Sequence, residues 1–179
     1  IRRFDRGADS ARTHMEDFAQ IFSVFPERKY EKANYCNLAE VIWTEIGAPG
    51  VTEFVRRLVF NALIGNADMH LKNWSLIYPD GRTPALAPAY DFVSTIAYIE
   101  DEKMALNFVS AGVRKFSELD IHVFRRFANK VRVPEKLVTD AIEETRARFD
   151  EAWDKERRAL PLTKGVVGAI EKHRTTLKL

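Results

Sequence analysis

Apolar residues recur at helical intervals over most of the chain, and they predict a mainly α-helical fold. In residues 53–63 the apolar side chains follow an unbroken i, i+4 pattern with charged residues on the opposite side, which is typical of an amphipathic helix. A second apolar stripe covers residues 35–46 and begins after Asn34, a residue type that favours helix N-termini. We therefore expect two consecutive helices in this part of the chain.

The flanking segments carry helix-start signals as well. Thr13 followed by Glu16 has the spacing of a capping box, and this pair predicts a helix that ends before Pro26. Three further helices are expected toward the carboxyl end, opened in turn by Ser117 with Asp120, by Pro134 and by Thr163.

Helical spacing breaks between residues 64 and 73, where turn-forming and polar residues predict a loop. Residues 74–78 then alternate like a short strand, residues 79–82 predict a turn, and residues 84–88 predict an extended return segment. The pattern indicates one mostly helical unit over residues 1–179, with a small β-hairpin directly after the loop.

Composition excludes several classes of protein. The 179 residues are 46 % hydrophobic and 30 % charged, as in ordinary globular domains. Lys and Arg number 28 and Asp and Glu 26, and the resulting net charge of +2 indicates no polyanion-binding surface. Cys36 is the only cysteine, which excludes an internal disulfide and a multi-cysteine metal site. No apolar run approaches the roughly 18 residues of a membrane span, so we expect a cytoplasmic protein with no membrane partner.

The sequence contains neither G-x-x-x-x-G-K nor G-x-G-x-x-G, and it therefore carries no recognisable phosphate-binding glycine loop. It also begins at Ile1 rather than at a methionine. We therefore expect the chain to be a piece of a longer protein.

Side chains suited to phosphoryl transfer gather in residues 66–91. Asp68 and Asn73 lie five positions apart in the predicted loop, and Asp91 follows beyond the predicted hairpin. Magnesium-dependent phosphoryl transfer needs one aspartate beside the acceptor hydroxyl, and an asparagine and a second aspartate on the metal ion. The protein-kinase catalytic loop H-R-D-x-x-x-x-N has the same offset from Asp to Asn.

The residues around this loop admit other interpretations. Asp68 and Asp91 are also typical turn or capping residues, and His70 could brace the loop rather than contact a phosphate. Lys72 is either a phosphate contact or a solvated cation. A metal-dependent phosphohydrolase would use Asp68, His70 and Asp91 as ligands of Zn²⁺ or Mn²⁺. A docking module without catalytic activity would need none of these side chains.

Five segments match a single family together: Arg3–Arg6, Met15–Gln20, Pro26–Glu31, Gly65–Ser75 and Leu86–Asp91. They resemble the HipA-type serine/threonine kinases, the toxin halves of bacterial toxin–antitoxin pairs. The resemblance runs from residue 1 to about residue 91, and the helical remainder agrees with it in length and pattern.

The resemblance implies a fold and a set of site residues. It implies the helical carboxy-terminal lobe of a protein kinase with a small β-hairpin at the active site, where Asp68 accepts a proton and Asn73 and Asp91 hold Mg²⁺. The segment that joins the two lobes contacts adenine mainly through its backbone, and Arg2 stands there where the family has glutamate. The residues that it implies at the ATP site are Arg2, Arg3, Phe4, His70, Leu71, Lys72, Asn73, Tyr90 and Asp91.

The resemblance also implies partners. The expected activity transfers the γ-phosphoryl group of Mg-ATP to a serine or threonine hydroxyl of a protein, for which a translation component such as an aminoacyl-tRNA synthetase is a candidate. A helix-turn-helix antitoxin is the expected binding partner, with DNA contacted mainly through it. Because the amino-terminal lobe with its phosphate loop and ATP-anchoring lysine is absent from this sequence, we expect the isolated chain to be nearly inactive.

Overall fold

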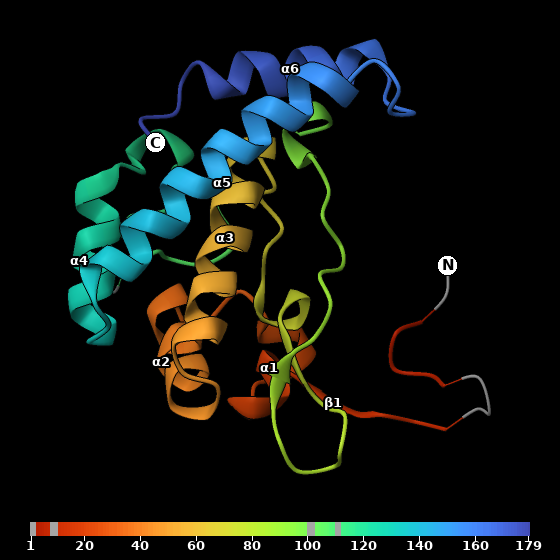
Figure 1. Cartoon of the computed structure of the whole chain (residues 1–179), viewed down its shortest axis with the longest axis vertical. Helices are drawn as coiled ribbons and strands as arrows, with labels where there is room; N and C mark the ends of the chain where they lie inside the picture. The colour runs from red at the N-terminus through yellow and green to blue at the C-terminus, as the bar shows by residue number, and fades with distance from the viewer. Residues whose placement is uncertain (1–2, 8–10, 100–102, 110–111) are drawn as a thin grey trace.

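Helices make up most of the structure (Figure 1), a computed structural model that describes residues 3–7, 11–99, 103–109 and 112–179. Its helices and strands follow in the order β1 (His14–Asp17), α1 (Phe18–Ile21), α2 (Tyr35–Glu45), α3 (Ala48–Ile64), β2 (Ser75–Tyr78), β3 (Ala85–Leu86), α4 (Ile121–Val131), α5 (Glu135–Glu156) and α6 (Lys164–Arg174). The mainly helical fold predicted from the sequence is confirmed.

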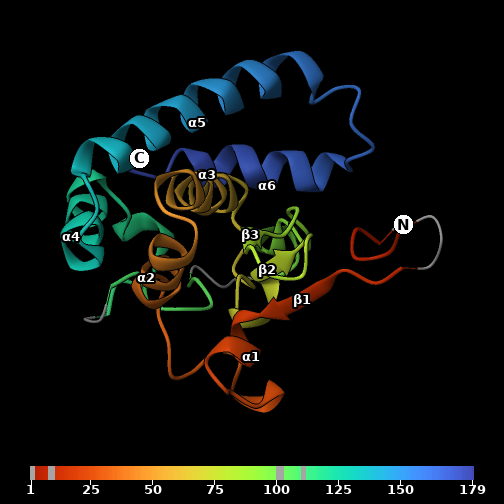
Figure 2. The same ribbon diagram turned by 60° about the horizontal axis from the view of Figure 1, so that its bottom comes forward.

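Helix α3 occupies the middle of the fold. Figure 2 shows α5 on one side of α3, and α2 with the sheet on the other. The approach of α2 to α3 depends on Gly50, because a Cβ atom there would lie 2.8 Å from side-chain atoms of Ile42 and Ile46. A glycine inside a helix costs backbone entropy, and here it allows the two helices to come together.

Aromatic side chains fill the core around α3. The ring of Phe54 lies 4.6 Å from that of Trp74, and the ring of Phe108 lies 4.7 Å from that of Phe124. All four residues are buried, so Trp74 is a packing residue of the core. Within the described ranges, no helix is long and apolar enough to span a membrane.

The predicted hairpin is confirmed, and a further strand joins it. Strands β2 and β3 pair antiparallel with Leu76 opposite Leu86, and β1 pairs antiparallel on the other edge of β2 with Met15 opposite Ile77. The sheet order is β1-β2-β3. This small antiparallel sheet lies next to the loop that follows α3.

The helix predicted to start at Thr13 is wrong, because the residues after Thr13 form strand β1. Pairing with β2 supplies backbone hydrogen bonds that outweigh the local capping signal. The capping box lies further along the chain instead: Asp17 accepts a hydrogen bond from the Gln20 amide, and the Gln20 side chain accepts one from the Asp17 amide. Helix α1 is consequently a single turn.

The other helix starts agree closely with the sequence. The side chains of Asn34, Asp120 and Thr163 accept hydrogen bonds from first-turn amides of α2, α4 and α6. Pro134 directly precedes α5. Ser117 lies in a short 3₁₀ turn before α4, so Asp120 alone caps that helix.

Helix α3 ends at Gly65, which adopts the left-handed conformation with φ +66°. A Cβ atom on Gly65 would lie 2.5 to 2.9 Å from three side-chain atoms of Ile96.

We expect Gly65→Ala to lower the free energy of unfolding by about 3 kcal/mol, because it combines backbone strain with a steric clash. Urea denaturation followed by circular dichroism measures the change. Gly168→Ala is the matched control, since Gly168 lies within α6 in open space, and there alanine should add about 0.5–1 kcal/mol.

Candidate active site

The loop between α3 and β2 is built around Asn66, a buried residue outside the site predicted from sequence. Its side chain donates to Asn61 Oδ1 at 2.8 Å and to the Asp91 carbonyl at 3.3 Å. Its Oδ1 accepts from the Asp68 amide at 3.1 Å. Asn66 therefore connects the residue predicted to be the base with the residue predicted to be a metal ligand, although they are far apart in sequence.

Asp68 and Asn73 lie together in the loop, joined by a hydrogen bond from the Asn73 side chain to the Asp68 backbone. Asn73 Nδ2 donates to the Asp68 carbonyl at 2.8 Å, which closes the loop on itself. The backbone amide of His70 donates to the same carbonyl at 2.9 Å. The Asp68 side chain is 48 % exposed, so its carboxylate is accessible while its backbone is fixed.

Asp91 lies on the surface just after the hairpin. Its backbone has φ +59°, a left-handed conformation that Asp and Asn tolerate better than most residues. The segment that follows returns to the end of α3, where the Thr95 hydroxyl donates to the Gly65 carbonyl at 3.1 Å and accepts from the Ala67 amide at 2.7 Å. Thr95, another residue without a predicted role, thus joins the Asp91 segment to the Asp68 loop.

Tyr90 supports the loop through hydrogen bonds of its hydroxyl group. Its hydroxyl donates to the Lys72 carbonyl at 2.8 Å and shares a short hydrogen bond with Ser75 Oγ. The ring of Phe4 lies 5.7 Å from the Tyr90 ring, which places the amino-terminal segment beside the loop. The Arg3 guanidinium pairs with Asp5 at 2.7 Å. Arg2, also predicted to contact the nucleotide, lies outside the described residues.

The remaining residues predicted to contact ATP differ in exposure. Leu71 is fully buried, so its side chain anchors the loop in the core instead of facing a ligand. His70 is also buried, and burial lowers the pKa of its imidazole, which is therefore neutral at pH 7. Lys72 is half-buried. The burial of His70 argues against a phosphate contact, and its buried Nδ1 has no hydrogen-bond partner among the described residues.

Tyr30 reaches the loop from the segment before α2. Its hydroxyl donates to Asp68 Oδ1 at 2.7 Å, and the edge of its ring meets the His70 ring at 5.1 Å. Burial and the neighbouring Asp68 carboxylate raise the pKa of Tyr30 to about 12. Tyr30 lies in one of the family-like sequence segments, but nothing in the sequence pairs it with Asp68.

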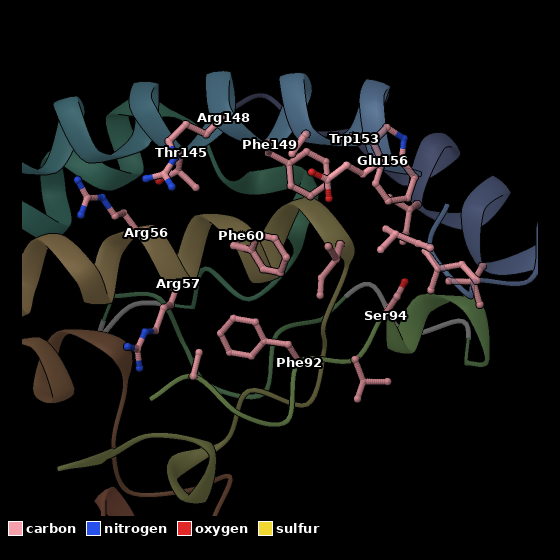
Figure 3. A pocket seen from close by; sticks show the side chains of 18 of the residues that line it. Arg56, Arg57, Phe60, Phe92, Ser94, Thr145, Arg148, Phe149, Trp153 and Glu156 are labelled. Atoms are coloured by element: carbon pink, nitrogen blue, oxygen red, sulfur yellow. The ribbon is translucent and has the colours of Figure 1, made fainter. Parts of the chain in front are cut away.

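A separate cavity of about 820 Å³ lies between α3, α5, α6 and the residues after Asp91. Figure 3 shows Phe60 and Phe92 facing each other in it, with Arg56 and Arg57 toward one end. Arg57 also donates to the Ala87 carbonyl at 2.7 Å. The residues that line the cavity include neither Asp68 nor Asn73, so the cavity is distinct from the candidate active site.

The phosphohydrolase alternative needs Asp68, His70 and Asp91 to converge on one metal ion. His70 Nε2 lies 4.0 Å from Asp68 Oδ1. In the part of the chain that the structure describes, no three His, Cys, Asp or Glu side chains are grouped so that they could hold a metal ion. The geometry therefore gives no support to a three-ligand transition-metal site.

Comparison with known proteins places the chain in a family. A model of the HipA-like C-terminal domain matches residues 1–153. The chain belongs to this family. The match therefore confirms the family resemblance that the sequence motifs of this HipA-like domain indicate.

Relatives of this HipA-like domain carry the name of an enzyme class. It is 50 % identical over 180 residues to "Putative kinase Y4dM" of Sinorhizobium fredii, covering 100 % of this chain and 43 % of that protein. It is 34 % identical over 149 residues to "Putative kinase Y4mE" of the same organism, covering 77 % of this chain and 34 % of that protein. The chain thus spans less than half the length of these relatives.

The fold is similar to that of a chain in the solved complex of the Shewanella oneidensis toxin–antitoxin system HipA, HipB and its operator DNA. The TM-score is 0.77, and the match covers 98 % of this chain and 46 % of that chain. Sequence identity is 20 %, so the similarity concerns the fold. It supports a HipA-like architecture for the helices and the small sheet.

Proposed function

We propose that the chain is the carboxy-terminal lobe of a HipA-type serine/threonine protein kinase, and that it supplies the base and the metal ligands for transfer of the ATP γ-phosphoryl group. The observation that carries the proposal is the hydrogen-bond network of Asn66, which ties Asp68 and Asp91 into one site. A loop that served only as a connection would not need a buried asparagine bonded to both residues.

Asp68 is the proton acceptor in this site. The oxygen of a protein serine or threonine attacks the γ-phosphorus, the bond to the oxygen that bridges to ADP breaks, and the hydroxyl proton passes to the Asp68 carboxylate. The loop contributes by orientation, because the Asp68 backbone is held by Asn66 and Asn73 while its side chain faces outward. Such positioning accounts for much of the catalysis in phosphoryl transfer.

Asn73 and Asp91 suit Mg²⁺ as ligands. Asn73 uses Nδ2 for the Asp68 carbonyl, which leaves its amide oxygen for a cation, and Asp91 offers an exposed carboxylate. Mg²⁺ prefers such oxygen ligands, and it is usually held by one or two protein groups together with phosphate oxygens and water. When bound, Mg²⁺ would neutralise charge on the nucleotide phosphates.

The partners belong to the same proposal. We propose a protein serine or threonine as the acceptor, with a translation component such as an aminoacyl-tRNA synthetase as a candidate substrate. A toxin role with a DNA-binding antitoxin is supported by the fold similarity to a protein solved with HipB and operator DNA. A purely docking role remains an outcome of the activity test, and it would require that phosphotransfer be absent.

Transfer of ³²P from γ-labelled ATP to protein, followed by phosphoamino-acid analysis, tests the proposed reaction in the polypeptide that carries this lobe. Phosphoserine or phosphothreonine on protein is expected. Release of free phosphate without labelled protein would contradict the kinase proposal and favour a phosphohydrolase.

We expect Asp91→Asn to weaken divalent-cation binding at least about tenfold, since even the loss of a residue that supports a metal ligand weakens affinity by that much. Asparagine tolerates the left-handed backbone of position 91, so the fold should persist. Broadening of amide NMR signals by Mn²⁺, used in place of Mg²⁺ with ATP, measures the effect on this chain. Asp80→Asn is the control, because Asp80 lies in the hairpin turn and bonds Arg82 and Thr83. Equal broadening in wild type and Asp91→Asn would reject this metal site.

A further inference from the structure

Tyr30 contacts the proposed base directly from a distant part of the sequence. Its hydroxyl is 2.7 Å from Asp68 Oδ1, and the two residues are separated by 38 positions. Among the described residues, Tyr30 gives the one side-chain hydrogen bond that the Asp68 carboxylate receives. His70 Nε2 lies at 4.0 Å from the same oxygen, beyond hydrogen-bonding distance.

The backbone of Asp68 is fixed, but its side chain is not. Backbone groups of Asp68 bond to the side chains of Asn66 and Asn73 and to the His70 amide. These contacts leave the carboxylate free to rotate about the side-chain bonds, and the side chain is 48 % exposed. Among the described residues, the Tyr30 hydroxyl is therefore the side-chain donor that restrains this carboxylate.

Tyr30 is itself held against the loop. The Leu71 amide donates to the Lys29 carbonyl at 3.2 Å, which ties the Tyr30 segment to the base-bearing loop at the adjacent residue. The edge of the Tyr30 ring packs on the buried His70 ring, and the Lys29 ammonium lies 5.1 Å from the Tyr30 ring centre. Tyr30 is 45 % exposed, and these contacts hold its hydroxyl against Asp68 at the surface of the loop.

We propose that Tyr30 is a positioning residue for the kinase reaction: its hydroxyl holds Asp68 Oδ1 and presents Oδ2 to the acceptor hydroxyl of the substrate. The proposal rests on the proposed function, because it assigns Asp68 as the base. In the reaction the acceptor proton moves to Oδ2 while the acceptor oxygen forms its bond to the γ-phosphorus and ADP leaves. The Tyr30 proton stays on its own oxygen throughout.

The state of the phenol fits this role. Its raised pKa, about 12, keeps it protonated and able to donate at neutral pH. His70 next to it is neutral because burial lowers its pKa, so it does not compete with Tyr30 as a charged donor to Asp68. A neutral donor on one oxygen leaves the carboxylate its negative charge and its capacity to take a proton.

A spectroscopic test on this chain asks whether the contact exists in solution. In protein labelled at the tyrosine ¹³Cζ position, the Tyr30 signal at pH 7, assigned with Tyr30→Phe, should move when Asp68 is changed to Asn. The exposed Tyr98 is the internal reference. A Tyr30 signal that stays in place would overturn the proposal, because a hydroxyl that contacts Asp68 must respond to the loss of the carboxylate charge even if it still donates to the asparagine oxygen.

A kinetic test uses the active protein that carries this lobe. We expect Tyr30→Phe to lower kcat by about ten- to a hundredfold, the scale of a misplaced catalytic group, with the KM for ATP and the thermal stability unchanged. Tyr98→Phe is the matched control and should leave kcat unchanged.

Three results would overturn the role of Tyr30. A higher kcat in Tyr30→Phe would show that the phenol blocks the base, and ³²P on Tyr30 would show that it is an acceptor. Full activity in Tyr30→Phe would show that Asp68 needs no such support. If the wild-type protein transfers no phosphate although the ¹³C signal shows the contact, the proposed function is wrong, and the positioning role is wrong with it. If the wild-type protein transfers phosphate and Tyr30→Phe does so equally well, only the positioning role is wrong.

Discussion

Asp68→Asn should lower phosphotransfer to protein by about 10²- to 10⁴-fold, the usual contribution of a positioned general base. Asparagine has the same shape and its Oδ1 can still accept from Tyr30, so the loop should keep its structure. What the variant loses is the negative charge and the oxygen that takes the acceptor proton. The measurement is the initial rate of ³²P incorporation into protein in the active polypeptide that carries this lobe.

Asp80→Asn again provides the control, since it removes one carboxylate from the hairpin turn, where its partners are Arg82 and Thr83. The control should keep the wild-type rate. If Asp68→Asn retained more than a tenth of the wild-type rate with an unchanged melting temperature, Asp68 would not be the base.

Asn66→Asp should lower the free energy of unfolding by about 3–5 kcal/mol, the range for an uncompensated buried charge. The substitution changes one atom, but it replaces the Nδ2 donor with an oxygen that faces Asn61 Oδ1 and the Asp91 carbonyl. Three acceptors would then meet in a buried space with no proton between them. Urea denaturation at pH 7 measures the loss. Stability should partly return at low pH, because a protonated carboxyl group can donate again.

The matched control is Asn34→Asp at the start of α2. Asn34 accepts from the Cys36 and Asn37 amides through Oδ1, and aspartate caps helices as well as asparagine does. Asn34→Asp should therefore change stability by less than about 0.5 kcal/mol. Similar losses in the two variants would show that Asn66 is not the centre of a buried network.

Helix positions could be predicted from sequence because their signals are local. The apolar stripe of α3 and the capping residues of α2, α4 and α6 act within a few residues, so each helix start is visible without tertiary information. The hairpin was visible for the same reason. Strand β1 was missed because its partner, β2, lies some sixty residues away, and a local capping pattern at Thr13 and Glu16 suggested a helix there.

In the candidate site too, local features could be predicted from sequence and long-range contacts could not. Asp68, Asn73 and Asp91 could be named from spacing and residue type, which are properties of the sequence. Asn66 and Tyr30 could not be given roles, because their roles depend on contacts with residues 25 and 38 positions away. The exposure of the site side chains could not be predicted either, because it depends on tertiary packing. Leu71 is completely buried because the loop packs against the core there.

The contact between the Gly65 turn and Thr95 has a consequence for motion. The Ile96 amide and the Thr95 hydroxyl both donate to the Gly65 carbonyl, at the very end of the long central helix. The segment with Asp91 and the loop with Asp68 are therefore joined at the Gly65 carbonyl, and we expect them to move together as a single rigid body. Opening and closing around a nucleotide would then take place at the boundary of this body, while the distance between base and metal ligands stays constant through the cycle.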